Sequence, residues 1–423
     1  MQYTMDNVLN ENIGSAKDNA TSAIHNWYKF TAGFSYKLVD LIVDEMDVPP
    51  TNIFEPFAGC GTTLVAAQKK GIHSVGNESQ QLMCDVINAK LNWDIERIEC
   101  VNYIQEISDY VSTRIGNDEI WGKCHELLKT LYDKHTLKTL YLIRDAIRNI
   151  SNEKYALFFN LALSQTLHKA ALHPIAVPYI VRSKNLANPG NAWEKFTMII
   201  NQMLADLDLM PHHNRYAKVY KADSRKLNPQ VEDASCDLCI TSPPYLNNLD
   251  YGEVSKVHTH FFELTKDWHD ITEKVRKDLV TGATTHYRDC DFDLSNFRES
   301  EFALSNKILM NDLESRYMYL KKYSHERNGK KSFHILMMHY FEDMFYVLKE
   351  MRRVLEPGSK AFLILGDSAP YGAYIPTTQI LGEIALSTGF SEFRIDKIRS
   401  RGHKWKIKTR HNVELSENLL QLI

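Results

Sequence analysis

A glycine-rich turn between a short apolar run and an expected helix constrains the fold of this chain most strongly. Residues 53–63 read IFEPFAGCGTT, and a helix is expected to begin at Thr62 or the next residue and to end near Gly71. Gly59 and Gly61 leave the backbone open to a ligand, because no Cβ intrudes. The turn lacks the Gly-Lys-Ser/Thr ending of a phosphate-binding loop, since Thr62 follows Gly61. A neutral or zwitterionic nucleoside is therefore a better candidate ligand for this turn than a phosphate.

Strands and helices alternate around this turn. Strands are expected at 73–76, 218–221, 236–240, 361–365, 392–398 and 413–422, and strong helices at 333–355 and 377–387. This alternation is typical of an α/β fold with a doubly wound, mostly parallel sheet. Ligands of such a sheet bind at the carboxyl ends of its strands.

One acidic residue lies where a nucleoside would need it. Glu78 follows the strand at 73–76. In nucleoside-binding α/β folds, an acid just past the second strand accepts both hydroxyls of a ribose. A glutamate that simply faces solvent is the alternative, but the distance from the glycine-rich turn favours the ribose ligand.

A second informative stretch follows the expected strand at 236–240. The apolar run breaks into Thr241-Ser242-Pro243-Pro244-Tyr245, where two prolines cannot continue a central strand because neither supplies an N–H. A rigid loop here holds a hydroxyl, main-chain carbonyls and an aromatic face close together, so a flat polar molecule could be stacked and hydrogen-bonded. The alternative is a proline-stiffened surface turn.

The remaining segments suggest two to three domains for 423 residues. Residues 1–22 are expected to form a loose tail. The α/β domain is discontinuous, at 23–91 and 215–423, because the amphipathic pattern of 92–214 predicts a large helical insertion. Residues 265–331, charged and poorly patterned, are expected to form a second insertion.

Composition excludes several classes of protein. No apolar run approaches the roughly 18 residues that a membrane span needs, and the first residues lack a secretion signal, so we expect no membrane partner and an intracellular protein. Seven scattered cysteines indicate reduced thiols. We expect no metal site at Cys236 and Cys239, since residues three apart on a strand point to opposite faces and no second ligand pair follows.

A basic segment stands out in a chain whose net charge is −3. Residues 397–410 read KIRSRGHKWKIKTR and contain no acid. Lysines and arginines neutralise phosphates, and the tryptophan could stack on a base or sugar, so the segment predicts nucleic-acid binding. A solvated basic hairpin is the alternative. The residues concerned are Lys397, Arg399, Arg401, Lys404, Trp405, Lys406, Lys408 and Arg410.

Together these motifs resemble the DNA amino-methyltransferases, which use S-adenosylmethionine to methylate the exocyclic amine of cytosine (N4) or adenine (N6), many of them in restriction–modification systems. Residues 55–62 are similar to the family's cofactor motif D-P-F-x-G-S-G-T, with Glu55 for Asp and Cys60 for Ser. Residues 241–245 are similar to its catalytic motif. Residues 25–35 and 366–368 resemble its N-terminal and G-D-S segments, whereas neither insertion matches the family.

The resemblance implies a Rossmann-like methyltransferase fold, with a seven-stranded sheet whose last strand is antiparallel. It implies S-adenosyl-L-methionine as cofactor, double-stranded DNA as substrate, a cognate restriction endonuclease as a possible partner, and the nucleoid of a bacterial or archaeal cytoplasm as location. The cofactor residues implied are Phe30, Glu55, Phe57, Gly59, Gly61, Thr62, Glu78, Asp223 near the adenine amine, and Thr241. The catalytic residues implied are Ser242, Pro243, Pro244 and Tyr245.

The chemistry agrees with this set of residues. An exocyclic amine is a poor nucleophile, and hydrogen bonds from its two hydrogens to Ser242 and the Pro243 carbonyl would localise its lone pair while Tyr245 stacks on the flipped base. No metal or covalent intermediate is required. Ser242 favours cytosine N4, because adenine-specific members usually have Asp or Asn there. The alternatives are adenine N6, an RNA base amine, and a non-catalytic nucleic-acid-binding subunit. Target recognition is expected in 92–214, supplemented by 265–331.

Overall fold

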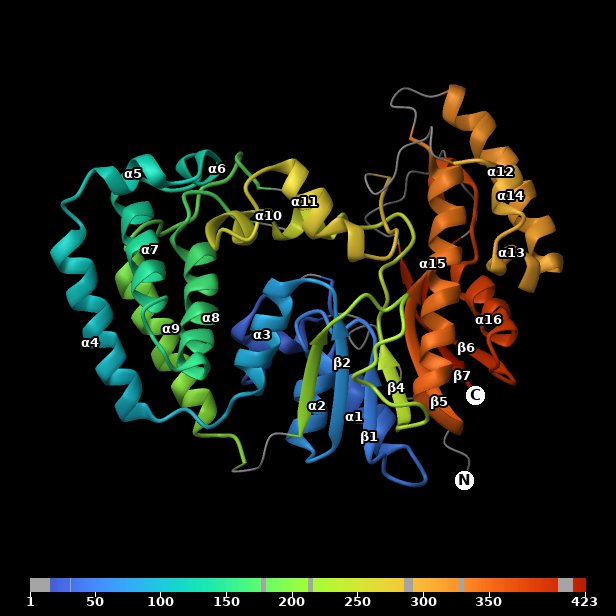
Figure 1. The fold of residues 1–423 in the computed structure, drawn as a ribbon, viewed down its shortest axis with the longest axis horizontal. Helices are drawn as coiled ribbons and strands as arrows, with labels where there is room; N and C mark the ends of the chain where they lie inside the picture. Colours follow the sequence, from blue (N-terminus) through green and yellow to red (C-terminus); the bar gives the residue numbers. More distant parts are fainter. Residues whose placement is uncertain are drawn as a thin grey trace.

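The computed structural model describes residues 16–30, 32–175, 180–211, 216–284, 292–326, 331–401 and 414–423. At its centre lies a seven-stranded sheet with the strand order β3-β2-β1-β4-β5-β7-β6 (Figure 1). The first five of these strands are parallel, and β7 runs antiparallel to both β5 and β6. The predicted Rossmann-like methyltransferase fold with an antiparallel last strand is confirmed. The strands are β1 (Asn52–Glu55), β2 (His73–Glu78), β3 (Ala217–Lys221), β4 (Cys236–Thr241), β5 (Leu355–Gly366), β6 (Phe393–Arg401) and β7 (Leu415–Leu422).

Alternating side chains of the strands form two cores, one on each face of the sheet. Ile53 and Leu238 pack against one pair of helices, while Phe54 and Cys239 pack against the other pair. Successive side chains of a strand point to opposite faces, so every central strand must be apolar on both sides. The first pair is α1 (Tyr36–Asp44) and α2 (Thr62–Lys69), and the second is α15 (Phe333–Val354) and α16 (Thr377–Ser387).

The helical insertion forms a third core beyond the β3 edge of the sheet. It packs on α3 and is continuous with buried residues of α10, so it is joined to the α/β domain on two sides. Figure 1 shows it at the opposite end of the molecule from α12–α14. Helix α3 (Gln81–Leu91) belongs to the α/β domain, and the helices of the insertion are α4 (Arg97–Arg114), α5 (Glu119–Lys123), α6 (Glu126–Lys129), α7 (Lys134–Ile147), α8 (Glu153–Ala170) and α9 (Ala192–Leu207).

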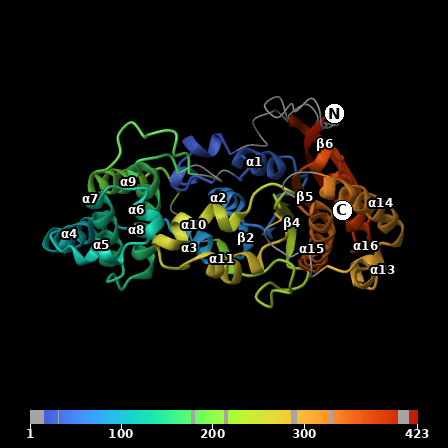
Figure 2. The ribbon, with the colours of Figure 1, turned by 90° about the horizontal axis from the view of Figure 1, so that it is seen from above.

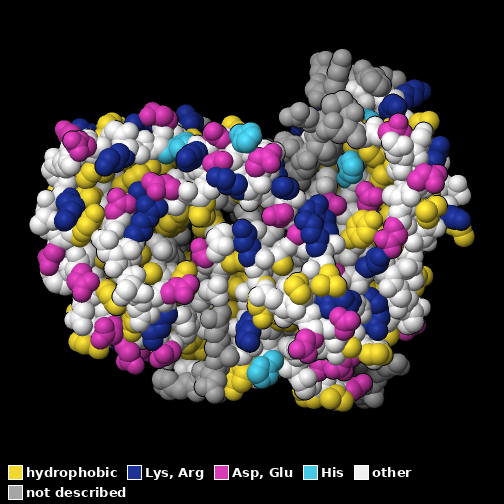
Figure 3. Space-filling model, in the orientation of Figure 1, with side chains coloured by type: hydrophobic (Ala, Val, Ile, Leu, Met, Phe, Trp, Pro, Cys, Tyr) yellow, Lys and Arg dark blue, Asp and Glu magenta, His cyan; other side chains and the backbone are white. Residues whose placement is uncertain are grey.

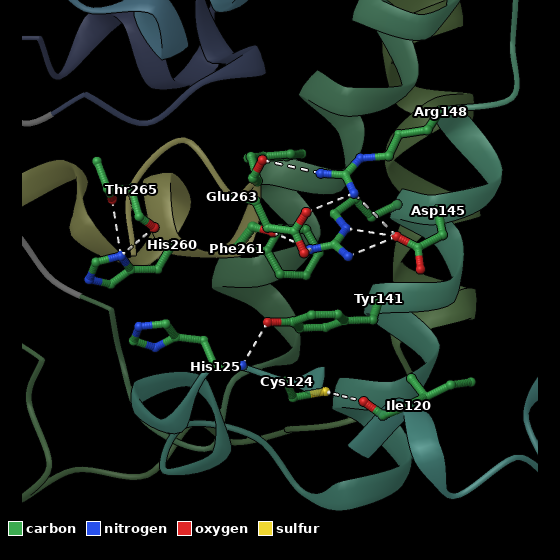
Figure 4. A network of polar contacts seen from close by, with 12 residues as sticks. Ile120, Cys124, His125, Tyr141, Asp145, Arg148, His260, Phe261, Glu263 and Thr265 are labelled. Atoms are coloured by element: carbon green, nitrogen blue, oxygen red, sulfur yellow. Dashed lines mark hydrogen bonds and ion pairs between the residues drawn. The ribbon is translucent and has the colours of Figure 1, made fainter. Parts of the chain in front are cut away.

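Helix α10 runs from the loop after β4 towards this insertion, and Figure 2 shows α10 and α11 from above. At the far end of α10, Arg144 of α7 donates to the Phe261 carbonyl at 2.7 Å and pairs with Glu263 at 3.0 Å (Figure 4). Arg148 pairs with the same glutamate at 2.9 Å. The remaining helices are α10 (Tyr251–Phe261), α11 (Trp268–Lys274), α12 (Leu294–Phe297), α13 (Glu301–Ser305) and α14 (Lys307–Glu326), with single 3₁₀ turns at η2 (Asp18–Thr21), η3 (His25–Trp27), η4 (Arg276–Asp278) and η6 (Pro370–Gly372).

Two expectations need correction. Residues 16–22, expected in the loose tail, include a packed turn: Asn19 is buried, donates to the Phe34 carbonyl and accepts from the Tyr36 N–H. Cys236 and Cys239 both contribute to the same core, contrary to the expectation that they point to opposite faces. Cys236 lies at the start of β4, where the register against β5 shifts because β5 has extra residues between Leu355 and Lys360. Burial raises the pKa of both thiols, that of Cys236 to about 12. No helix among the described residues is long and apolar enough to cross a membrane.

Two helical glycines give a matched test of the packing between α16 and β6. A Cβ on Gly382 would lie 2.5 Å from the Phe393 ring, whereas a Cβ on Gly122 of α5 would meet nothing within 4 Å. Overpacking of this kind costs about 1–3 kcal/mol, while Gly to Ala at an open helical site stabilises by up to about 1 kcal/mol. We expect Gly382→Ala to lower, and Gly122→Ala to keep or raise, the urea midpoint of unfolding. A Gly382→Ala variant as stable as the wild type would contradict this packing.

Candidate active site

A pocket opens at the carboxyl ends of the parallel strands, where the fold predicts a ligand. The cofactor and catalytic motifs, far apart in sequence, both contribute to its wall. The implied cofactor residues that line it are Phe30, Phe57, Gly59, Thr62 and Glu78, and the implied catalytic residues that line it are Ser242 and Pro244. Glu55, Gly61, Asp223, Thr241, Pro243 and Tyr245 do not line it.

The glycines of the turn have conformations that other residues rarely adopt. Gly59 has φ +55°, and a Cβ there would lie 3.3 Å from the Phe30 ring. Gly61 has φ +83° and is the N-cap of α2, where a Cβ would lie 3.2 Å from Ile87. The sequence therefore needs glycine at both positions, one beside the pocket and one behind it.

Glu55 lies behind the pocket and connects its two motifs. Its carboxylate accepts hydrogen bonds from the Phe57 N–H at 2.9 Å, from the Thr63 hydroxyl at 2.7 Å and from the Thr241 hydroxyl. The side chain is buried, and burial raises its pKa to about 8 despite these donors. Glu55 therefore joins the turn after β1, the start of α2 and the end of β4.

Glu78 ends β2 inside the pocket. Its Oε2 accepts from the Gly59 N–H at 2.9 Å and its Oε1 from the Gln80 N–H at 2.8 Å. Burial raises its pKa to about 7. These two backbone bonds fix the carboxylate beside the glycine-rich turn, where each oxygen has further lone pairs for hydroxyl donors.

Two residues of the pocket each have a buried polar atom that a polar ligand could hydrogen-bond. Asn77 Nδ2 and Gln80 Oε1 have no hydrogen-bond partner among the described residues, and both residues line the pocket. The Asn77 amide orientation follows from its Oδ1, which accepts from Asn228 at 2.8 Å. Buried polar groups in native proteins are normally hydrogen-bonded, so a free donor and a free acceptor here suit a nucleoside with both kinds of group.

Sequence reasoning did not identify several residues of this wall. Tyr251, the first residue of α10, stacks with Phe30 at a ring separation of 6.5 Å, and Leu279 and Val280 come from the second insertion. Arg225 holds that segment in place: it donates to the Lys277 carbonyl at 2.8 Å and pairs with Asp343. Asp343 in turn accepts from the Thr281 N–H at 2.8 Å. These contacts join residues that are far apart in sequence, so no local sequence pattern predicts them.

Asp223 faces arginine and lysine instead of the pocket. Its carboxylate pairs with Arg225 at 2.8 Å and Lys226 at 3.0 Å. Burial alone raises its pKa, but these cationic partners hold the pKa below its ordinary value. Its neighbour Ser224 lines the pocket and donates to the Pro56 carbonyl.

The loop after β4 is fixed by hydrogen bonds from three elements. Ser242 Oγ donates to the Ile364 carbonyl at 3.3 Å, so its lone pairs point away from that bond and can accept. The Pro244 carbonyl accepts from the buried Tyr340 hydroxyl at 2.9 Å. The Tyr245 hydroxyl donates to Glu417 of β7 at 2.9 Å.

Only part of the expected basic surface lies among the described residues. Lys397 is half exposed and 3.4 Å from Glu414, and Arg399 is paired with Glu417 at 2.6 Å. Nothing is described of the Arg401 side chain. The residues outside the described part of the chain are Lys404, Trp405, Lys406, Lys408 and Arg410.

One group of side chains has the spacing of metal ligands among the described residues. Asp267, His269 and Asp270 lie together at the start of α11. Asp267 caps this helix at the Asp270 N–H, and Asp270 pairs with Lys274 at 3.0 Å. These local contacts of an exposed helix end account for the cluster.

Comparison with known proteins finds relatives along nearly the whole chain. The Type II methyltransferase M.BsoBI of Geobacillus stearothermophilus is 22% identical over 435 residues, covering 93% of this chain and 84% of that protein. M.AvaI of Nostoc sp. is 22% identical over 412 residues (92% and 83%), and M.MvaI of Kocuria varians is 20% identical over 401 residues (89% and 84%).

No family model matches the chain. Among solved structures, the rRNA methyltransferase aviRa of Streptomyces viridochromogenes aligns over 63% of this chain and 79% of that chain with 10% identity, but its TM-score of 0.21 carries no argument. The three relatives above share one description, and along nearly its whole length the chain is similar to these Type II methyltransferases.

Proposed function

We propose that this protein methylates the N4 amine of a flipped cytosine at a specific site in double-stranded DNA, with S-adenosyl-L-methionine as methyl donor. The observation that carries this proposal is the single pocket wall shared by residues of the cofactor motif, such as Gly59 and Glu78, and of the catalytic motif, Ser242 and Pro244. A donor and an acceptor base bound on these two sides would be adjacent, which is the main requirement for direct transfer.

The pocket fits the proposed cofactor in its polar groups. Glu78 would accept the two ribose hydroxyls, and Asn77 and Gln80 offer the free donor and acceptor that a purine nucleoside can use. Phe30, Phe57 and Gly59 would line the amino-acid and sugar moieties, while Glu55, Gly61, Thr62 and Thr241 shape the turn around them. Asp223, tied to Arg225, would support the adenine side indirectly. S-Adenosylmethionine would supply an electrophilic methyl group at its sulfonium.

The residues of the chain would act on the amine by orientation. Ser242 Oγ, whose proton is directed to Ile364, would accept one amine hydrogen, and the Pro243 carbonyl would accept the other. Both bonds localise the nitrogen lone pair and strengthen as positive charge develops on the amine, which then loses one proton. Tyr245 would stack on the extruded base, because a stacked base hides its amine edge in the duplex.

Contact with DNA must rely on a local basic surface. The net charge is −3, and lysine, arginine and acidic side chains are interspersed over the coloured part of the face in Figure 3. The proposed surface is the segment from Lys397 to Arg410, and the proposed reader of the sequence is the insertion 92–214, supplemented by 265–331. A partner endonuclease and a nucleoid-associated, cytoplasmic location stay predictions that follow from this function.

A methyl-transfer assay with unmethylated duplex DNA tests the reaction. We expect labelled methyl to appear in DNA as N4-methylcytosine by mass spectrometry. Ser242→Ala should lower kcat by about tenfold to a hundredfold, because a buried amine hydrogen loses its acceptor. N6-methyladenine would replace the cytosine assignment, and transfer to RNA alone would replace the DNA assignment. Transfer no greater than that of a Ser242→Ala/Tyr245→Ala variant would refute the enzyme proposal and leave a nucleic-acid-binding subunit.

The pKa of Glu78 predicts how cofactor binding depends on pH. Burial raises this pKa to about 7, and the ionised form accepts both ribose hydroxyls, so the Kd for S-adenosylmethionine should fall as pH rises through about 7. Glu78→Gln should bind about tenfold to a hundredfold more weakly and lose this dependence. Calorimetry between pH 6 and 8.5 measures both, with exposed Glu383→Gln as matched control. An equal slope in Glu78→Gln would assign the titration to another group.

An exchange of the helical insertion tests its role in recognition. When residues 92–214 are replaced by the aligned segment of M.AvaI, we expect the hybrid protein to methylate the DNA sequence that M.AvaI recognises. Unchanged cofactor affinity would show that the α/β domain still folds. A hybrid that folds and still methylates the original sequence would exclude this insertion as the reader.

A further inference from the structure

Glu417 joins two residues that the sequence assigns to different sites. Its Oε1 accepts a hydrogen bond from the Tyr245 hydroxyl at 2.9 Å, and its Oε2 lies 2.6 Å from Arg399 Nε. The Glu417 side chain is 4% exposed and that of Arg399 27%. The Glu417 carboxylate thus forms an ion pair with Arg399 through one oxygen and accepts the Tyr245 hydroxyl through the other.

The sheet topology places Glu417 at the catalytic edge. In β7 it pairs with Gly366, the last residue of β5, and on its other side with Arg399 of β6. Because β7 is antiparallel to β5, its first residues lie beside the carboxyl ends of the parallel strands. The loop after β4 emerges at this same edge, and Tyr245 reaches Glu417 across the end of β5.

A hydrogen bond to an ionised carboxylate restricts the tyrosine ring. Such charge-assisted bonds are about twice as strong as neutral ones. A tyrosine side chain has two torsion angles. With the backbone held, the position of the hydroxyl oxygen sets the first torsion, and because a phenolic O–H prefers the plane of the ring, the direction of its bond to Glu417 restricts the second. The buried Tyr340 hydroxyl donates to the preceding Pro244 carbonyl at 2.9 Å, so the backbone before Tyr245 is held as well.

We infer that Glu417 is a positioning residue that presents the Tyr245 ring to the target base, and that Arg399 acts through Glu417 instead of on a DNA phosphate. This inference rests on the proposed function of the Ser242–Tyr245 loop. It revises the expected role of Arg399, because this arginine forms an ion pair with a buried carboxylate of the neighbouring strand.

A double-mutant cycle tests the connection between the two side chains. Tyr245→Phe removes only the hydroxyl and should lower kcat about tenfold with little change in the cofactor Kd. Glu417→Gln should cost about the same, because Arg399 has only donors and would turn the amide oxygen towards itself, leaving the NH₂ group facing Tyr245. In the Tyr245→Phe background, Glu417→Gln should cost less than about twofold. Independent, multiplicative losses would overturn the inference.

The salt dependence of DNA binding distinguishes the two roles of Arg399. Arg399→Gln should lower kcat like Glu417→Gln while the slope of log Kd against log salt stays unchanged. A phosphate contact would instead reduce that slope by about one, with a uniform loss of affinity, and would overturn the inference. Arg394→Gln is the matched control, since Arg394 pairs with Asp396 at 2.7 Å near the other end of the same strand.

Labelled-tyrosine NMR spectra of the full chain report on the ring without DNA or methyl donor, with the Tyr245 signal assigned by Tyr245→Phe. Glu417→Gln and Arg399→Gln should shift this signal, and Arg394→Gln should not. Shifts in a protein that transfers no methyl group would refute the proposed function while the contact stands. No shift, in an active protein, would overturn the positioning role alone.

Discussion

The three hydrogen bonds to Glu55 are the constraint on which the rest of the site depends. They bring the Phe57 backbone, the Thr63 hydroxyl and the Thr241 hydroxyl to one buried carboxylate. Two of these donors belong to the glycine-rich turn and its helix, and the third ends the strand that carries the catalytic loop. Any displacement of β4 against β1 would break a bond to a buried group, at a cost of about 1–3 kcal/mol. The glycine-rich turn and the loop after β4, which both line the pocket, are therefore fixed to each other.

Helix α10 extends this fixed geometry to the helical insertion. It begins at Tyr251 in the pocket wall, and its other end is bound by Arg144 through the Phe261 carbonyl and Glu263. Its N-cap Asp250 is paired with Arg276, just before the segment that carries Leu279 and Val280. A reader of DNA in the insertion would thus be connected by one helix to the site where the base enters.

The strands, the glycine-rich turn and helix 377–387 were predictable, because each depends on local patterns. Apolar runs, Gly59 and Gly61, and the stop at Gly389 act within a few residues of the element that they define. The interpretation of 265–331 as poorly patterned missed the 20-residue α14, although its buried Met310, Leu313, Tyr317 and Leu320 recur at helical spacing. The register shift between β4 and β5 was not predictable, because it arises from the pairing of two strands that are far apart in sequence. The pocket wall contains residues of both kinds. Glu78 was predictable because it ends a strand, whereas Tyr251 and Val280 are brought to the wall by tertiary packing.

The burial of two carboxylates at this site lowers the stability of the fold at neutral pH. The pKa of Glu55 rises from 4.5 to about 8 and that of Glu78 from 4.5 to about 7, with burial as the main cause in both. A raised carboxyl pKa means that the folded chain holds its proton more tightly than the unfolded chain does. Its stability is therefore full below about pH 4.5 and is lost as pH rises through the folded pKa. Hydroxyl donors on a bound nucleoside would offset this loss at Glu78, whereas Glu55 has three protein donors and gains nothing directly. A nucleoside bound at Glu78 would thus recover the free energy that folding loses there, and its stabilisation of the fold would grow with pH.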